Sequence, residues 1–283
     1  MTEETAALYV VPTPLGNLSD LTRRAAEVLC AVPWVAAEDT RHSAPLLKQV
    51  GSSARLLAAH EHNEQAAAEQ VIAKLAAGEA VALVSDAGTP GISDPGARLV
   101  ARVRAAGFRV VPLPGPCAAV TALSAAGLAE PHFLFYGFLP AKAGQRDAAL
   151  QALVGLPYAL VFYEAPHRIL ETVAALARAL GGERTLVVAR ELTKLFETIH
   201  SGPLAEAEAW LTADPNRQRG EFVLLVSGAP ERSSDALSDE AERVLRLLLD
   251  EGLPVKQAAK LAQAISGASK NALYARALEL KQD

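Results

Sequence analysis

The sequence predicts an α/β protein of two lobes with a cleft between them, followed by a small helical unit. Short apolar runs of strand length alternate with amphipathic helical patterns, which is typical of a mainly parallel sheet. The spacing between these runs shortens near residue 115, which indicates a second sheet of a different kind. With 283 residues, of which 51% are hydrophobic and 21% charged, the chain is long enough to bury a substantial core.

The first lobe is expected to span residues 1–114. Its strands are predicted at residues 8–11, 34–37, 56–59, 81–84 and 108–113, with helices between them. The run at 81–84 consists of four apolar residues and suits a strand that is buried on both faces.

The second lobe is expected to span residues 115–228. A helix should follow Gly115-Pro116 and end at Gly127. Strands are predicted at 133–138, 159–163, 185–190, 196–200 and 221–227, and their close spacing favours antiparallel pairs.

A third unit, residues 233–283, should consist of three helices after a linker at 228–234. Ser238 is predicted to cap the first helix, which ends at Gly252, and Pro254 begins the second. The turn Ser266-Gly267-Ala268 then gives a helix-turn-helix-like pattern. A packing unit without any role in nucleic-acid binding remains open, because phosphate contacts come only from Lys256, Lys260, Lys270 and Arg276.

The loop that follows the buried strand is the main candidate for a binding site. Between Gly88 and Gly96 five of nine positions are glycine or proline, so the backbone can approach a ligand closely. We expect Asp94 to cap the next helix, with Pro95 at its first position. Asp86 is available for an ammonium or hydroxyl group, or else bonds its own backbone as a turn aspartate.

The first strand leads into Pro12-Thr13-Pro14-Leu15-Gly16, where a dinucleotide-binding protein would carry a glycine fingerprint. Prolines remove amide donors, and both G-x-G-x-x-G and a P-loop lysine are missing from the sequence. This segment is therefore predicted to form a rigid, apolar rim of the binding site, which favours an uncharged or zwitterionic ligand.

Ionisable residues gather after several other strands. The segments are 37–43, 60–64, 162–168 and 190–194. At strand ends such groups can orient or deprotonate a substrate. For the segment 162–168, an ordinary ion pair between Glu164 and Arg168 is the simpler explanation. No metal site is expected, because His60 and His62 lack further ligands and Asn63 is better suited to cap a helix.

Charge and composition exclude several classes of protein. A net charge of −5 argues against a protein that coats nucleic acid without specificity, but leaves room for a local basic face. No apolar run reaches the roughly 20 residues of a membrane span, and residues 1–5 lack a signal-peptide pattern, so we expect a cytoplasmic protein. The two cysteines, Cys30 and Cys117, are expected to be buried thiols.

The sequence resembles the tetrapyrrole-methylase superfamily and, within it, the RsmI family of 16S ribosomal RNA cytidine 2′-O-methyltransferases. The matching stretches are residues 10–18, 38–41, 85–90, 93–96, 113–116, 162–168, 190–194 and 220–223. The resemblance covers nearly all of the chain to about residue 228, and the helical tail is similar to that family's C-terminal extension.

The resemblance implies a two-lobed tetrapyrrole-methylase-like fold, a homodimer, and S-adenosylmethionine as methyl donor, without a metal. Donor contacts then fall on Pro12, Leu15, Asp86, Gly88, Gly91, Ile92, Gly115, Pro116, Tyr163 and Leu192. The loop sequences Pro-Thr-Pro-Leu-Gly and Asp-Ala-Gly-Thr-Pro differ from those of corrin-modifying relatives, which favours an RNA substrate, the 16S rRNA of the small ribosomal subunit.

A base that accepts the 2′-hydroxyl proton would assist methyl transfer. The candidates are Glu38, Asp39, Glu164, His167 and Glu191. RNA contacts are expected from a basic strip of Arg41, Lys142, Arg146, Arg168, Arg190, Lys194, Arg217 and Arg219. A corrin-type small-molecule methyltransferase and a ligand-sensing DNA-binding regulator remain as alternatives.

Overall fold

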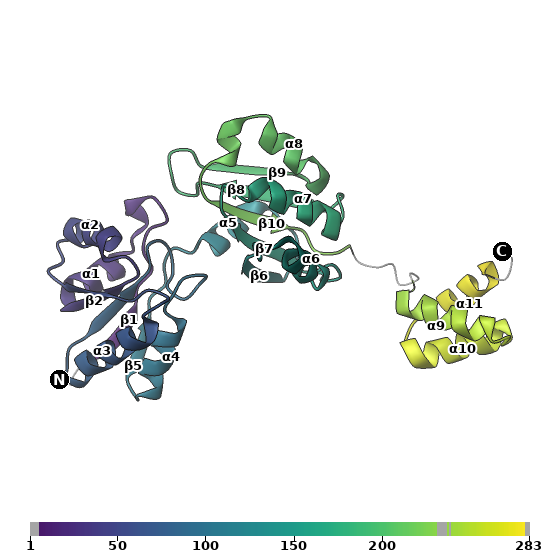
Figure 1. The fold of residues 1–283 in the computed structure, drawn as a ribbon, viewed down its shortest axis with the longest axis horizontal. Coiled ribbons are helices and arrows are strands. Elements are labelled where there is room, and N and C mark those ends of the chain that lie inside the picture. Colours follow the sequence, from purple (N-terminus) through teal and green to yellow (C-terminus); the bar gives the residue numbers. More distant parts are fainter. Residues whose placement is uncertain (1–5, 231–236, 238, 281–283) are drawn as a thin grey trace. The chain divides into compact units, whose positions relative to one another are not determined.

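A computed structural model describes residues 6–230, 237 and 239–280 of the chain. These residues form two compact units, Met1–Ala229 and Pro230–Asp283, which are described separately (Figure 1). The first unit holds two five-stranded sheets, one in each lobe, and the second holds three helices.

The first sheet has the strand order β3-β2-β4-β1-β5, and every pairing in it is parallel. Its strands are β1 (Ala7–Val10), β2 (Trp34–Ala37), β3 (Arg55–Ala58), β4 (Val81–Val84) and β5 (Arg109–Pro112). All five lie within one or two residues of the predicted positions. The central strand β4 is buried at all four positions, as its apolar run predicts.

Helices cover both faces of this sheet. Helices α1 (Arg23–Ala31) and α2 (Thr40–Val50) pack on the face that receives Ala82 and Val84. Helices α3 (Glu64–Ala76) and α4 (Ala97–Ala105) pack on the face that receives Val81 and Leu83. Alternate residues of β4 therefore enter two different cores, as the period of a strand requires.

The predicted cap of α4 is wrong. Gly96, not Asp94, occupies the cap position, and glycine has no side chain that could accept a capping hydrogen bond. Instead, Oε1 of the buried Glu64 accepts hydrogen bonds from the backbone N–H groups of Gly96 at 2.7 Å, Arg98 at 3.0 Å and Leu99 at 3.3 Å. A carboxylate from the start of α3 thus accepts hydrogen bonds from the unpaired N–H groups at the start of α4. Its negative charge also interacts favourably with the positive end of the α4 dipole.

Asn63 also behaves differently from its prediction. It occupies the cap position of α3, but its side chain makes no capping hydrogen bond. Its Oδ1 accepts from the N–H of His60 at 2.8 Å, and its Nδ2 donates to the carbonyl of Ala58 at 3.0 Å. The side chain therefore fixes the loop that precedes the helix.

The second sheet has the order β6-β7-β10-β8-β9. Its strands are β6 (Phe133–Phe138), β7 (Ala159–Glu164), β8 (Thr185–Arg190), β9 (Thr198–Pro203) and β10 (Phe222–Val226). The predicted antiparallel pairs are confirmed for β7 with β10, β10 with β8 and β8 with β9, whereas β6 and β7 run parallel. Strand β9 begins two residues later than predicted, and Phe196 lies in the preceding loop.

Helix α5 (Ala118–Ala126) packs on one face of the second sheet and ends at Gly127, as predicted. The opposite face carries α6 (Ala143–Gln151), α7 (Ile169–Leu180) and α8 (Ala207–Thr212). Helix α7 begins three residues after Pro166, which lies in the turn before it.

The second unit consists of α9 (Asp239–Asp250), α10 (Val255–Ser266) and α11 (Lys270–Glu279) around an alanine- and leucine-rich core. The predicted second helix is α10, with Pro254 at its cap position and Ser266 as its last residue, the predicted third helix is α11, and Gly252 follows α9. The predicted cap at Ser238 and residues 231–236 of the linker lie outside the described residues.

The helices in the described part of the chain are all too short or too polar to cross a membrane. Cys30 is exposed and lies 2.9 Å from the carbonyl oxygen of Val50, so the prediction of a buried thiol is wrong there, whereas Cys117 is half-buried.

Candidate functional site

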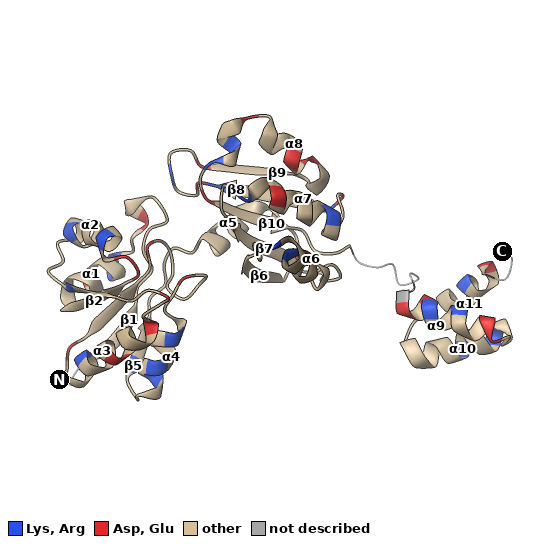
Figure 2. Ribbon diagram, viewed as in Figure 1, with Lys and Arg blue, Asp and Glu red and all other residues tan. Residues whose placement is uncertain are grey.

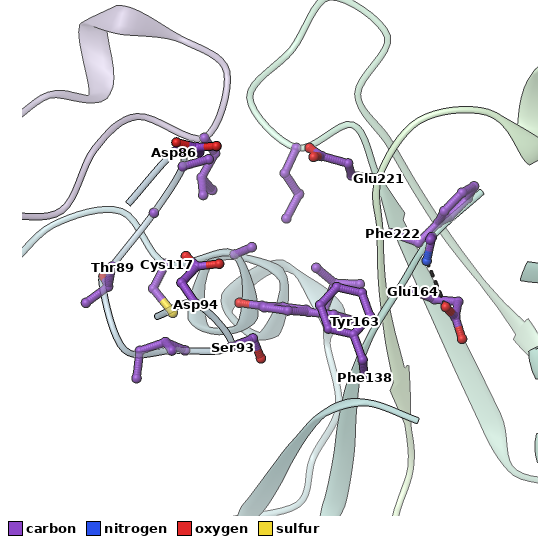
Figure 3. Close-up of a pocket in the computed structure, with 18 of the residues that line it drawn as sticks. Asp86, Thr89, Ser93, Asp94, Cys117, Phe138, Tyr163, Glu164, Glu221 and Phe222 are labelled. Atoms are coloured by element: carbon purple, nitrogen blue, oxygen red, sulfur yellow. Dashed lines mark hydrogen bonds between the residues drawn. The ribbon is translucent and has the colours of Figure 1, made fainter. Parts of the chain in front are cut away.

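A cavity of about 460 Å³ lies where the two sheets of the first unit meet. Loops at the carboxyl ends of β1, β2 and β4 form one wall, where ligands of open α/β sheets collect. Strands β7, β8 and β10 with the start of α5 form the other wall (Figure 3). The lining residues are Leu15, Glu38, Asp86, Ala87, Gly88, Thr89, Ile92, Ser93, Asp94, Cys117, Ala118, Phe138, Tyr163, Glu164, Ala165, Pro166, Ala189, Leu192, Glu221, Phe222 and Val223.

Backbone hydrogen bonds join the loops after β1 and β4. Thr13 N–H donates to the carbonyl of Gly88 at 2.8 Å, and Gly88 N–H donates to the carbonyl of Thr13 at 3.0 Å. The buried hydroxyl of Thr13 donates to the carbonyl of Ser85 at 3.1 Å. Gly88 has a φ of +80°, and a Cβ there would lie 3.3 Å from a methyl carbon of Leu15, so glycine suits this position on both grounds.

Three carboxylates of the first lobe line the cavity: Glu38, Asp86 and Asp94. Burial, and then the charges of neighbouring carboxylates, raise the pKa of Glu38 above its usual range and that of Asp94 to about 6. Oδ1 of Asp86 accepts a hydrogen bond from the Asp39 N–H at 3.1 Å, which fixes it against the end of β2. This wall is therefore strongly acidic and suits a ligand that carries positive charge.

Aromatic side chains form part of the opposite wall. Tyr163 accepts a hydrogen bond at its phenol oxygen from the Ala119 N–H at 3.0 Å, and burial raises the pKa of the phenol, which stays protonated. Phe135 and Phe138 both pack edge-on against the Tyr163 ring, with centroid distances of 4.9 and 5.7 Å.

Glu221, at the edge of the cavity, is held by an ion-pair cluster. Lys194 Nζ lies 3.1 Å from Glu191 Oε1 and 2.7 Å from Glu221 Oε2. The same Glu191 oxygen accepts the Glu221 N–H at 3.0 Å. A side chain at Gly220 would collide with Glu191, and one at Gly16 would collide with Lys194, so this cluster ties the first loop of one lobe to the second lobe.

The predicted donor-binding residues gather around this cavity. Six of them line it: Leu15, Asp86, Gly88, Ile92, Tyr163 and Leu192. The others lie behind the lining. Pro12 packs against Gly115, where a Cβ would lie 2.7 Å away, and the carbonyl of Pro116 accepts from the Thr89 hydroxyl at 2.7 Å. Gly91 lies in the same loop as Gly88.

The predicted catalytic residues divide into two groups. Glu38 and Glu164 line the cavity, but the carboxylate of Glu164 accepts hydrogen bonds from the Ala165 N–H at 2.8 Å and the Thr172 hydroxyl at 2.6 Å. Figure 3 shows the Glu164 carboxylate turned away from Tyr163. Asp39 caps α2 and pairs with Arg41, which holds its pKa well below the usual range, and His167 is exposed and outside the lining.

The predicted basic strip contains groups in very different settings, and Figure 2 marks lysine and arginine positions on α2 and α4 as well as around β8. Arg41, Lys142 and Arg219 are exposed. Arg146 is buried, with 4% of its surface exposed, and its guanidinium lies 3.5 Å from Glu171, so in this structure it is closed off from phosphate.

The remaining four members are engaged within the protein, Lys194 by the carboxylates of Glu191 and Glu221 and Arg168 by Glu164 at 3.4 Å. Arg168 donates to the carbonyl of Leu139 at 2.6 Å. Arg190 donates to the carbonyls of Phe196 and Arg219 at 3.0 and 3.1 Å. Arg217 stacks on the ring of Trp210.

Sequence reasoning missed several lining residues. Asp94 was visible in the glycine- and proline-rich loop, but it was interpreted as a helix cap. Phe138 and Glu221 each stand at the end of a predicted strand, which was the available signal. Within the described residues, no group of three histidine, cysteine, aspartate or glutamate side chains is arranged to hold a metal ion.

The chain matches two family models. The tetrapyrrole (corrin/porphyrin) methylases match residues 7–208, and the RsmI C-terminal HTH domain matches residues 235–281. The chain is 56% identical over 272 residues to ribosomal RNA small subunit methyltransferase I of Escherichia coli O157:H7, covering 96% of this chain and 94% of the relative. It is 55% identical over 274 residues to the protein of the same name from Pseudomonas aeruginosa, covering 96% of each.

Solved structures share the fold at lower identity. The methyltransferase CobJ aligns with a TM-score of 0.61 and 21% identity, covering 81% of this chain and 96% of that one. A uroporphyrin-III-C-methyltransferase from Thermus thermophilus aligns with a TM-score of 0.58 and 21% identity, covering 78% and 94%. These two alignments agree with the two-lobed fold predicted from the sequence.

Proposed function

The chain belongs to the tetrapyrrole methylase family and, within it, to the ribosomal RNA small subunit methyltransferase I family, and from this we propose the reaction that it catalyses. The chain is a methyltransferase, and its reaction is the transfer of a methyl group from S-adenosylmethionine to a ribose 2′-hydroxyl. The substrate is a cytidine of 16S ribosomal RNA in the small ribosomal subunit. We therefore place the protein in the cytoplasm, with its substrate.

The acidic wall of the cavity is the observation that carries the proposal for the donor. S-adenosylmethionine supplies a methyl group on a positively charged sulfur, which becomes a neutral thioether when the methyl group leaves. Burial raises the pKa of Glu38 and of Asp94, and the negative charge of Asp86 raises both further, so a bound cation relieves this repulsion. Phosphate ligands would instead be repelled by the same carboxylates.

The residues that would hold the donor are those whose backbone or apolar surface faces the cavity. They are Leu15, Asp86, Gly88, Ile92, Tyr163 and Leu192, supported from behind by Pro12, Gly91, Gly115 and Pro116. A cavity of about 460 Å³ lies within the range of about 300–1,000 Å³ typical of small-molecule sites.

Glu38 is our candidate for the base that accepts the 2′-hydroxyl proton. It lines the cavity, and burial raises its pKa, so its carboxylate is a stronger base than an exposed one. Glu164 and Glu191 have their oxygens engaged by hydrogen bonds within the protein, which suits positioning. Asp39 is engaged by Arg41.

RNA contacts are assigned to the exposed members of the basic strip. Arg41, Lys142 and Arg219 are the most accessible, and Arg168, Arg190, Lys194 and Arg217 contribute where their guanidinium or ammonium groups reach the surface. Arg146 is left out because it is buried. The family resemblance also supports a homodimer, which sedimentation of the purified protein tests directly.

The function is tested by incubating the purified chain with small ribosomal subunits and isotopically labelled donor, followed by mass spectrometry of the RNA nucleosides. The expected product is labelled 2′-O-methylcytidine. Glu38→Gln should lose most of the single-turnover rate, whereas Glu61→Gln, an exposed carboxylate after β3 outside the cavity lining, should keep it. Label on a corrin-type macrocycle, without label in RNA, would overturn the proposal.

A further inference from the structure

We propose that the side chain of Phe138 is a stacking platform for the nucleobase of the RNA nucleotide that is methylated. This inference rests on the proposed function and identifies the residue that presents the acceptor nucleotide to the cavity. Three features of β6 carry it: a bulge that redirects the side chain, a close contact that fixes the bulge, and a half-exposed ring at the cavity.

The bulge lies between Phe135 and Gly137, in the parallel pairing of β6 with β7. Phe135 pairs with Val161, Gly137 with Phe162 and Phe138 with Tyr163, so Tyr136 is the extra residue. In a regular strand Phe138 would point to the opposite face from Phe135. The bulge instead places both rings on the face of Tyr163, which their contacts with that ring confirm.

Gly137 fixes this bulge. Its φ of +80° is one that other residues rarely adopt, and a Cβ there would lie 2.9 Å from the hydroxyl oxygen of Ser93 in the loop after β4. Bulges are rare in parallel pairs and common beside active sites, where they redirect a side chain. The bulge is thus built against the loop that forms the acidic wall.

The Phe138 ring is placed to receive a large, flat ligand that arrives from solvent. It lines the cavity, yet 50% of the residue's surface is exposed, and its edge-on contact with Tyr163 holds it in position. In Figure 3 Phe138 and Tyr163 lie together, apart from Asp86 and Glu221. Because the ring is half exposed, a base that belongs to a much larger RNA can reach it from solvent, and the wall that carries Glu38, Asp86 and Asp94 remains for the donor.

Stacking of a base on an aromatic ring contributes about 1–3 kcal/mol by alanine substitution, which corresponds to about 5- to 150-fold in affinity. Phe138→Ala should therefore raise KM for small ribosomal subunits by a factor in that range. Phe138→Leu should behave like the alanine variant because it keeps apolar volume without a π-face, and Phe138→Trp should restore near wild-type KM. Binding of S-adenosylmethionine alone, measured by calorimetry, should change less than twofold.

Phe133→Ala is the matched control, because Phe133 lies on the same strand with 49% of its surface exposed but does not line the cavity. It should leave KM unchanged, and thermal melting of each variant checks folding. If the wild-type protein methylates the subunits and Phe138→Leu matches it in KM, the inference is wrong. Loss of donor binding in Phe138→Ala would also overturn it, by assigning the ring to the donor's adenine. A wild-type protein that leaves the RNA unmodified would instead refute the proposed function.

Discussion

Glu64 joins two helices that are distant in the sequence, and its replacement tests how the acidic wall of the cavity is held. The carboxylate is buried, with 7% of the residue exposed, and one of its oxygens accepts three backbone N–H groups at the start of α4. Glu64→Ala removes the acceptor and leaves these donors without a protein partner. The loop from Asp86 to Gly96 leads directly into that helix end and is loosened with it.

The loss of stability in Glu64→Ala follows from the geometry of these hydrogen bonds. The bonds to Gly96 and Arg98 are well formed, and each bond to a charged acceptor contributes about 1.5 kcal/mol or more, so we expect a loss of about 3 kcal/mol in the free energy of unfolding. For a unit of this size that corresponds to a fall of about 6–12 °C in Tm. Glu64→Gln keeps an oxygen acceptor without its charge and should lose about half as much.

Chemical denaturation followed by circular dichroism measures these differences, and calorimetry with S-adenosylmethionine reports the state of the loop. Glu69→Ala is the matched control, since Glu69 lies on the same helix in an exposed ion pair with Arg102 and should cost less than about 1 kcal/mol. If Glu64→Ala is no less stable than Glu69→Ala, the carboxylate does not cap α4 in solution and the reasoning fails.

Three further predictions follow from the charges around the cavity. Because a bound cation favours the ionised form of Asp94, whose pKa is raised to about 6, donor affinity should fall by up to about tenfold per unit below pH 6 and level off above pH 7. Calorimetry across this range tests it, and a slope that persists in Asp94→Asn would contradict it. Lys194→Met should destabilise the protein by about 1–2 kcal/mol at pH 7. The folded-state pKa of Glu191 lies below its usual value because hydrogen bonds from Glu221 N–H and from Lys194 outweigh burial. The ionised Glu191 therefore stabilises the folded protein fully at any pH above its unfolded-state pKa. The gap between Lys194→Met and wild type should therefore stay constant down to about pH 4.5, the ordinary pKa of Glu191, and shrink below it in urea titrations; a gap independent of pH would count against the ion pairs. Finally, KM for ribosomal subunits should rise steeply with salt while donor affinity does not, and Arg219→Ala should reduce the slope of log KM against log salt by about one; an unchanged slope would remove Arg219 from the interface.

Local patterns were enough to predict most of the strands. The apolar run at 81–84 is β4, and the run at 185–190 is β8, because buried strands need little beyond continuous apolar residues. The start of β9 was placed too early because Phe196 has the composition of a strand residue, yet it lies exposed in the loop between β8 and β9. Composition alone does not separate a buried aromatic residue from an exposed one.

Contacts across the chain could not be predicted in the same way. Asp94 followed by Pro95 is a typical start of a helix, but the cap of α4 comes from Glu64, more than thirty residues away, and Asp94 lines the cavity instead. Glu164 stands at a strand end like a catalytic acid, but the hydroxyl of Thr172 and a backbone N–H engage it. Only the folded chain distinguishes a carboxylate that caps from one that faces a ligand.

The paired backbone hydrogen bonds between Thr13 and Gly88 have a consequence for how this architecture diverges. Because these bonds join main-chain atoms, the join between the two loops tolerates exchange of neighbouring side chains as long as Gly88 keeps its φ of +80°. Substitutions at exposed lining positions such as Ile92 and Phe138 therefore change what the cavity accepts without breaking the join between the loops.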